Sequence, residues 1–459
     1  MRLLLLPALL AVLPAFAQSP APEDAHARAV AAGYKALTLC SAHFNAGRSQ
    51  QRVEVLELRG IYPEYDARVG ALQATVDARA RTVAVAFDDA LPPRIAAWRP
   101  NLGCAQLPIG ADAKAVDALP RFDTAAPDLD GEAWPLGERD ATGQARGDAA
   151  ALQHAVAAAF DTPQFGEGTA TTGVVVLQDG RIVAERYRDG FGPHVAQRTW
   201  SVAKSLAGAL IGVAVRDGVL DPMQPAPVPE WQQPGDPRAA ITLDQLLRMS
   251  SGLHSDTAGN RTDALYFGGA TVAEAATGWP LQAPPGTRYR YANNDIVLAI
   301  HALRAKTGDD ARALARPFTD LFWPLGMTRT RAETDWRGGF VLSSQVWSTA
   351  RDLARFGLLL QDDGVFDGRR LLPEGWVRAA TTPSGPQPDD RDFGYGATLW
   401  LLQRSPGVPA DTFAALGNRG QVVVVVPSRK VVIVRRGEDP AGHRFDTAAF
   451  AAAVLAVLD

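Results

Sequence analysis

The region from residue 151 to residue 459 has predicted strands near both of its ends and predicted helices between them. This order limits the folds that the region can adopt. Residues 173–177 and 181–186 are predicted strands on either side of the turn Gln178-Asp179-Gly180, a pattern typical of a hairpin. Three further strands are predicted near the C-terminus, at residues 413–416, 421–426 and 431–435. The stretch between the two groups is mostly helical in pattern. We therefore expect an α+β fold in which both ends of this region form one sheet, with a helical subdomain inserted.

The residues before this region have a pattern of their own. Ala-rich helical spacing predicts a helix over 21–44, and alternating apolar residues predict a strand over 52–59. Residues 72–87 predict two strands, whereas 109–147 are rich in Asp, Pro and Gly. The expected organisation is a small N-terminal α+β extension at 18–110, a linker at 111–150 and a main domain at 151–459.

The chain begins with the features of a secretory signal peptide, which we place at residues 1–17. Arg2 is followed by an apolar stretch over 3–14, too short to span a bilayer, and by small residues at Ala15-Phe16-Ala17. An uncleaved anchor or a buried helix is the alternative. No cysteine follows that could carry a lipid at this site. We expect a periplasmic or secreted protein without a stable membrane anchor.

The expected export also bears on the two cysteines of the chain. In an exported protein an even number of cysteines is compatible with a disulfide, here between Cys40 and Cys104. Two separate buried thiols are the alternative.

Composition and missing motifs exclude several classes of function. The net charge is −4 and the pI is near 6, which disfavours nucleic acid as a partner. The sequence has no CxxC, no HExxH, no P-loop and no GxSxG. We expect no metal and no organic cofactor.

The sharpest chemical feature is Trp200-Ser201-Val202-Ala203-Lys204-Ser205, which opens a strongly apolar helix over 201–216. Three residues apart on a helix, Ser201 and Lys204 share one face. Burial can lower the pKa of a lysine until its neutral amine accepts the serine proton. The free N–H at a helix start can also stabilise an oxyanion. The alternative is a capping serine with a lysine that extends to solvent.

Two later segments carry residues suited to the same chemistry. Tyr291 and Asn293 form a Tyr-x-Asn that can place a phenol and an amide beside a serine–lysine pair. Gly417 and Asn418 lie between two predicted strands, where glycine lets a backbone approach a ligand and an N–H can bind an oxyanion. Taken alone, each segment also fits an ordinary loop or hairpin.

In this order, Ser-x-x-Lys, Tyr-x-Asn and a glycine-containing C-terminal strand resemble the serine β-lactamase/penicillin-binding-protein superfamily. The Tyr-x-Asn is similar to the class C-like branch, and Trp-Ser-x-x-Lys-Ser with Gly-Asn-x-Gly-Gln resembles 6-aminohexanoate-dimer hydrolase-type enzymes and related esterases. The resemblance spans about 165–459 and implies an antiparallel sheet flanked by helices. It also implies a nucleophilic Ser201, a basic Lys204, a proton relay at Tyr291 and support from Asn293. The N–H groups of Ser201 and Asn418, beside Gly417, would form the oxyanion hole.

One departure from the superfamily bears on substrate choice. Its Lys-Thr-Gly falls at Ala415-Leu416-Gly417, so the lysine is missing, and we assign a substrate-binding charge to Arg419 instead. A literal Lys306-Thr307-Gly308 is predicted to be only a helix end with a glycine cap.

These features predict an exported serine hydrolase that cleaves a small-molecule ester or linear amide through an acyl-enzyme. A β-lactamase, a D,D-peptidase or penicillin-binding protein, and an inactive peptidoglycan-binding relative are the alternatives. Protein partners, oligomeric state and the part played by the N-terminal extension stay open.

Overall fold

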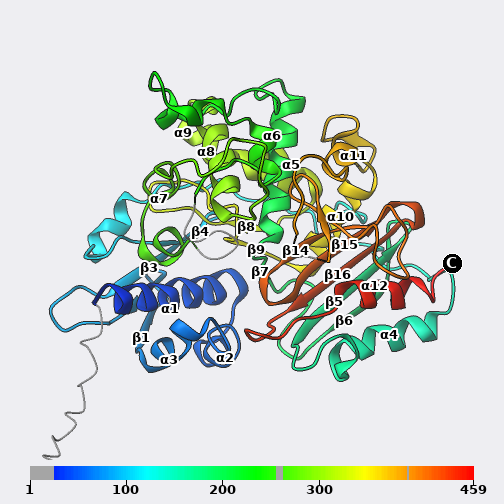
Figure 1. Cartoon of the computed structure of the whole chain (residues 1–459). Helices are drawn as coiled ribbons and strands as arrows, with labels where there is room; N and C mark the ends of the chain where they lie inside the picture. The colour runs from blue at the N-terminus through cyan, green and yellow to red at the C-terminus, as the bar shows by residue number, and fades with distance from the viewer. Residues whose placement is uncertain (1–24, 255–261, 390–391) are drawn as a thin grey trace, which may run out of the picture.

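A seven-stranded antiparallel sheet forms the base of the molecule in the computed structural model, which describes residues 25–254, 262–389 and 392–459. Its strand order is β12-β13-β14-β15-β16-β5-β6. The strands are β5 (Thr171–Gln178), β6 (Arg181–Tyr187), β12 (Gly394–Tyr395), β13 (Trp400–Leu401), β14 (Phe413–Gly417), β15 (Gln421–Val426) and β16 (Val431–Gly437). Because β16 pairs with β5, the two ends of the region join in one sheet, which confirms the prediction (Figure 1).

Both faces of this sheet are covered by helices. Helices α4 (Ala149–Asp161) and α12 (Thr447–Leu455) pack on one face, and α10 (Ala350–Gln361) packs on the other (Figure 1). Along β15, Val422 and Val424 belong to the cluster under α4 and α12, while Val423 and Val425 point to the opposite cluster. A strand buried on both faces has no polar side, which explains its unbroken run of valines.

Helices above the sheet in Figure 1 form the inserted part. They are α5 (Val202–Arg216), α6 (Leu243–Leu247), η5 (Ala264–Gly268), α7 (Val272–Ala276), α8 (Asn293–Thr307), α9 (Asp310–Arg316), η6 (Pro317–Phe322) and α11 (Trp376–Ala380). Every residue of α5 from Val202 to Ala214 is buried, as its apolar sequence predicts. Helix α8 ends at Thr307, and Gly308 closes it with a φ of +71°. The helix end predicted at Lys306-Thr307-Gly308 is therefore confirmed.

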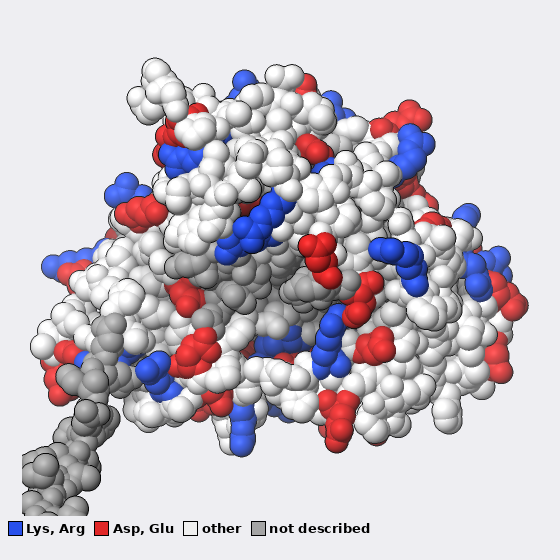
Figure 2. Space-filling view, viewed as in Figure 1, with Lys and Arg blue, Asp and Glu red and all other residues white. Residues whose placement is uncertain are grey.

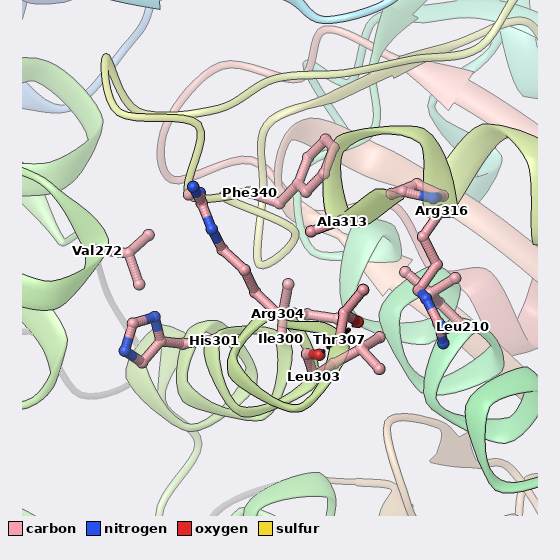
Figure 3. Close-up of a pocket in the computed structure, with 12 residues that line it drawn as sticks. Leu210, Val272, Ile300, His301, Leu303, Arg304, Thr307, Ala313, Arg316 and Phe340 are labelled. Atoms are coloured by element: carbon pink, nitrogen blue, oxygen red, sulfur yellow. Dashed lines mark hydrogen bonds between the residues drawn. The ribbon is translucent and has the colours of Figure 1, made fainter. Parts of the chain in front are cut away.

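A small cavity of about 20 Å³ lies within this helical layer (Figure 3). Figure 3 shows its apolar walls, among them Leu210 of α5, Ile300 of α8 and Phe340. Two of the polar side chains that line it bind groups outside the lining: His301 contacts Glu230 at 3.0 Å, and Arg304 donates to Asp310 at 2.8 Å. The cavity holds about one water at most, so it offers no room for an organic substrate.

The N-terminal region forms a second, four-stranded antiparallel sheet covered by helices. Its elements are α1 (Ala25–Ala46), α2 (Gln50–Val55), α3 (Pro63–Ala71), β1 (Ala74–Asp77), β2 (Thr82–Val85), β3 (Arg94–Arg99) and β4 (Gly103–Gln106). The predicted helix over 21–44 corresponds to α1, and the strand pair within 72–87 corresponds to β1 and β2. The signal peptide predicted at 1–17 lies outside the described residues.

The strand predicted over 52–59 is wrong, because these residues form α2 and a following turn. Ser49 caps this helix by accepting a hydrogen bond from the Arg52 backbone N–H. The apolar residues follow a helical turn, with Val53 fully buried and Val55 59% exposed. β-Branched valines favour strands only where a pleated surface receives them, and here the cap decides the local structure.

A disulfide joins Cys40 of α1 to Cys104 of β4, as predicted. Both cysteines are fully buried, so the bond fastens the helix to its sheet from inside the core. Across the described ranges, no helix has the length and apolar character needed to cross a bilayer.

The N-terminal region shares its core with the rest of the chain. Tyr34 of α1 packs against Phe267 of η5, with ring centroids 4.4 Å apart. Residues 111–147 then run to the far side, where Arg355 of α10 donates to the carbonyls of Pro135 and Gly137. These contacts join the N-terminal region to the helical layer and residues 111–147 to α10.

Candidate active site

Ser201 stands where a short strand turns into α5. The strand β7 (Gln197–Arg198) pairs with β9 (Val346–Ser348), which in turn pairs with β8 (Arg331–Ala332). Trp200 then adopts a φ of +49°, an uncommon and strained conformation for a bulky residue. The hydroxyl of Ser201 does not cap α5, so it is not used to satisfy the start of the helix.

Lys204 lies one turn into α5 and is 1% exposed. Its Nζ donates to Ser201 Oγ at 2.8 Å, to Asn293 Oδ1 at 2.7 Å and to the Ser343 carbonyl at 2.8 Å. The amine is thus held by three oxygen atoms from three separate segments. The alternative of a lysine extending to solvent does not fit this burial.

The environment of Lys204 favours its neutral form. Burial, and to a smaller degree the positive charge of Arg198, lowers the pKa of this amine well below its ordinary value. Arg198 is itself buried, lies 3.7 Å from the Trp200 ring centroid and donates to Ser344 Oγ at 2.9 Å. A strained turn and a buried cation therefore flank the serine–lysine pair.

Tyr291 and Asn293 reach the same place from the start of α8. Asn293 is the first residue of that helix, which aims its amide at Lys204. The ring of Tyr291 lies with its centroid 5.0 Å from Lys204 Nζ and packs against Trp400 at 5.3 Å. The structure thus brings together the Tyr-x-Asn and the Ser-x-x-Lys.

Gly417 and Asn418 approach Ser201 from the end of β14. A Cβ at Gly417 would lie 2.4 Å from the Thr199 carbonyl oxygen and 3.1 Å from the Ser201 backbone nitrogen. Only glycine permits this approach of β14 to the segment that carries the serine. The side chain of the following Asn418 donates from Nδ2 to the Tyr62 hydroxyl at 2.8 Å.

Arg419 points away from the serine–lysine pair and into the N-terminal region. Its Nε donates to Glu438 at 2.9 Å, and its terminal nitrogens donate to the carbonyls of Leu56 (2.9 Å), Arg59 (3.2 Å) and Gly60 (3.1 Å). Its side chain is 5% exposed. Every guanidinium nitrogen is committed to protein groups, which argues against the expected role of Arg419 as the charge that binds a substrate.

A cavity of about 910 Å³ opens over this cluster. Figure 2 shows that the face drawn there is hollowed at its centre, where α5 and β14 approach the N-terminal region in Figure 1. The lining includes Ser201, Asn293 and Asn418, together with Leu416 of β14. Seven Phe, Tyr and Trp residues also line it: Tyr62, Trp200, Tyr266, Tyr291, Phe393, Trp400 and Phe445. A volume of this size accepts an organic molecule.

Several groups of this site were not anticipated from the sequence. The Ser343 carbonyl that holds Lys204 is a backbone atom, and no side-chain pattern marks it. Tyr266, whose hydroxyl lies 2.6 Å from Ser343 Oγ, and Tyr62 come from segments without a recognisable motif. Only Arg198 could have been suggested from the sequence, because it is a cation three residues before Ser201.

The described residues contain no group of three or more His, Cys, Asp or Glu side chains arranged to hold a metal ion. What the arrangement offers is a hydroxyl, a buried amine, a phenol and backbone N–H groups around one cavity. These are the groups needed to transfer an acyl group to a serine.

Comparison with known families identifies the relationship. The profile of the Beta-lactamase family matches residues 156–457, about two thirds of the chain. The chain belongs to the β-lactamase family. It is therefore a serine hydrolase of that family, with the β-lactamase/transpeptidase-like fold that the resemblance implied.

Individual relatives agree with this assignment. The 6-aminohexanoate-dimer hydrolase of Paenarthrobacter ureafaciens is 29% identical over 309 residues, which cover 61% of this chain and 76% of the relative. A family VIII carboxylesterase shares the fold with a TM-score of 0.56 at 17% identity, covering 69% of this chain and 98% of that one. The penicillin-binding protein homologue from Pyrococcus abyssi shares it with a TM-score of 0.53 at 19% identity, covering 67% and 77%.

Proposed function

We propose that this protein is an exported serine hydrolase that cleaves ester or linear amide bonds of small, uncharged substrates through an acyl-enzyme on Ser201. Lys204 is its general base, and Tyr291 relays the proton to the leaving group. The backbone N–H groups of Ser201 and Asn418, beside Gly417, hold the oxyanion, and Asn293 orients the lysine. Neither a metal nor an organic cofactor enters these steps.

The contacts of Lys204 carry this proposal. A neutral amine has two N–H donors and one lone pair. Asn293 Oδ1 and the Ser343 carbonyl can take the two donors, which leaves the lone pair for the Ser201 hydroxyl at 2.8 Å. Since the lowered pKa favours the neutral amine, the partners and the protonation state agree.

The reaction follows from this arrangement. As Ser201 Oγ bonds to the substrate carbonyl carbon, its proton passes to Lys204 Nζ and negative charge moves to the carbonyl oxygen. The bond to the leaving group then breaks, and the leaving group takes a proton through Tyr291. A water molecule attacks the acyl-enzyme in the reverse sense, which releases the acid and restores the serine.

The preference for uncharged substrates is supported by the end of β14. Ala415 and Leu416 occupy the positions where the superfamily has lysine and threonine, and Leu416 lines the cavity. Arg419 supplies no free charge, since Glu438 neutralises it. The linear amide is supported by the relative named for hydrolysis of the 6-aminohexanoate dimer.

Export is supported by the buried disulfide between Cys40 and Cys104, because disulfides persist in oxidising compartments. The signal-like segment at 1–17 agrees with this destination.

A turnover assay of the wild type and Ser201→Ala tests the proposal. We expect the wild type to cleave p-nitrophenyl acetate and a linear amide oligomer, and Ser201→Ala to lose at least about 10³-fold in kcat with an unchanged thermal melt. Ser205→Ala is the matched control, since Ser205 lies on the same helix and donates to the Thr398 carbonyl instead. It should keep its rate within about three-fold.

A chromogenic cephalosporin completes the assay. Slow or absent cephalosporin turnover supports the ester/amide assignment, whereas turnover faster than that of the ester would make the protein a β-lactamase. Equal activity of Ser201→Ala and the wild type would contradict the proposed nucleophile.

A further inference from the structure

The N-terminal region contributes a residue to the cavity around Ser201. The family match begins at residue 156, so residues 25–110 lie outside the family-matched part of the chain. Nevertheless Tyr62, at the start of α3, lines the same 910 Å³ cavity as Ser201. The region therefore forms part of the wall of the candidate active site.

Tyr62 contacts both segments that flank Ser201. Its ring meets that of Trp200 edge to face, with centroids 6.4 Å apart, and Trp200 directly precedes the serine. Its hydroxyl accepts from Asn418 Nδ2 at 2.8 Å, and Asn418 directly follows Gly417. A substrate bound at Ser201 therefore lies within a wall that includes the Tyr62 side chain.

Buried and directional contacts fix the segment around Tyr62. On one side, Arg419 donates to the carbonyls of Leu56, Arg59 and Gly60, and the Ala441 N–H donates to Gly60 at 2.7 Å. On the other side, the Tyr65 hydroxyl donates to Asp263 at 2.8 Å. Such anchoring holds the Tyr62 ring in one place relative to Ser201.

Charged residues such as Arg404 and Arg444 are part of the cavity lining, but Trp200 and Asn418, which contact Tyr62, are uncharged. Tyr62 stands with Trp200, Tyr291 and Trp400 around the serine, and the neighbouring charge of Arg419 is neutralised by Glu438. Aromatic faces bind apolar and planar groups through burial of surface, with an added gain from ring stacking.

We infer that Tyr62 is a specificity-determining residue whose ring binds an uncharged apolar or aromatic acyl group of the substrate. This inference rests on the proposed function, because it places the substrate at Ser201. The ring and the hydroxyl have separate effects: the ring supplies contact area for the substrate, and the hydroxyl restrains the Asn418 side chain.

Kinetics with two p-nitrophenyl esters test the inference on the full chain. For Tyr62→Ala, we expect kcat/KM to fall at least ten-fold with p-nitrophenyl benzoate, mainly through KM. The change with p-nitrophenyl acetate should stay within three-fold, because its acyl methyl group offers little apolar surface to the ring. Tyr62→Phe keeps the ring and should keep the ratio between the two esters.

Control variants separate this effect from a loss of structure. Phe44→Ala removes another partly buried N-terminal aromatic residue that does not line the cavity, and it should leave the ester ratio unchanged. If Tyr62→Ala melts more than a few degrees below the wild type, Tyr62→Leu replaces it, with the same loss expected for the benzoate. An equal loss on both esters, or no loss, overturns the inference.

A binding measurement makes the inference independent of turnover. Calorimetric titration of Ser201→Ala with hexananilide, a neutral linear amide with an apolar six-carbon acyl chain, should give a Kd that Tyr62→Ala raises at least ten-fold and Phe44→Ala does not. If Ser201 proves unnecessary for turnover but this difference in Kd is found, the proposed function fails and the inference about Tyr62 stands. If hexananilide does not bind, or Tyr62→Ala leaves its Kd unchanged, the inference fails, whatever the activity of Ser201→Ala.

Discussion

At the scale of single residues, the protonation state of Lys204 depends on its burial and on the neighbouring charge of Arg198. An exposed lysine keeps its proton up to a pH near 10. Lys204 is buried and lies in the field of Arg198, so both effects act against its charged form. Only the neutral amine can accept the Ser201 proton, so the proposed rate should rise with pH through the lowered pKa and then level off.

The contribution of Arg198 to this effect gives a prediction. In Arg198→Gln the positive charge disappears, so the pKa of Lys204 rises and the acidic limb of the kcat/KM profile moves to higher pH. We also expect a partial loss of rate at neutral pH, because a smaller fraction of Lys204 is then neutral. The measurement is the pH dependence of p-nitrophenyl acetate hydrolysis between pH 5 and 10.

Arg312→Gln serves as the control, because this half-exposed arginine contacts Thr319 and Asp320 away from the cavity. Its profile should superimpose on that of the wild type. A limb that stays in place in Arg198→Gln, or moves to lower pH, would contradict the assignment of that limb to Lys204.

At the scale of elements, the turn between β14 and β15 is held by the N-terminal region. Arg419 has a φ of +55° within this turn, and its guanidinium reaches Glu438 and the carbonyls beyond α2. Asn418, whose N–H is proposed to bind the oxyanion, is the residue before it. The geometry of the oxyanion hole thus depends on an anchor outside the family-matched part of the chain.

This anchor predicts the outcome of Arg419→Ala. Removing one partner of a buried ion pair leaves Glu438 unpaired, so the free energy of unfolding should fall by about 3 kcal/mol. The kcat/KM should fall by the same factor, roughly ten-fold, for neutral p-nitrophenyl butyrate and for anionic mono-p-nitrophenyl succinate, because the turn loosens for both.

Arg444→Ala is the matched control, since Arg444 lines the cavity but is exposed and pairs only loosely with Asp392 at 3.6 Å. It should leave stability within about 0.5 kcal/mol of the wild type. A selective loss of the succinate ester in Arg419→Ala would show instead that Arg419 binds a substrate carboxylate.

At the scale of the whole molecule, the sequence predicted the elements best where local and tertiary preferences agree. The strands at 173–186 and 413–435 and the helix at 201–216 have apolar patterns that match their final burial. The segment at 52–59 failed because a capping serine outweighed the valines. The disulfide followed from a count of two cysteines in a chain expected to be exported.

The site was predictable only as far as it resembles a known pattern. Ser201, Lys204, Tyr291 and Asn293 come together as the order of motifs implied. The place of Tyr62 in the cavity wall and the direction of the Arg419 side chain depend on long-range packing of the N-terminal region, which has no recognisable motif. No local sequence pattern could therefore indicate either of them. The substrate-binding charge was assigned to Arg419 because the superfamily lysine is missing, whereas the buried carboxylate of Glu438, directly after β16, pairs with its guanidinium.

The shared core leads to a prediction about the molecule as a whole. A chain that begins at Asp148 retains all of the family-matched region but lacks α1 and its sheet. Phe267 and Leu265 of η5, now buried, would face water, and Arg94 would no longer bind the carbonyls of Phe267 and Gly268. We expect this shortened chain to bind a hydrophobic dye and to melt without a cooperative transition, because exposed apolar surface favours aggregation. Its kcat/KM should fall at least about 100-fold, because the cavity loses a wall.

The comparison is a chain that begins at Gln18, which should melt cooperatively and hydrolyse p-nitrophenyl acetate in a Ser201-dependent way. If the two chains had the same melting behaviour and the same rate, the N-terminal region would be an independent domain. That result would contradict its proposed part in the active site.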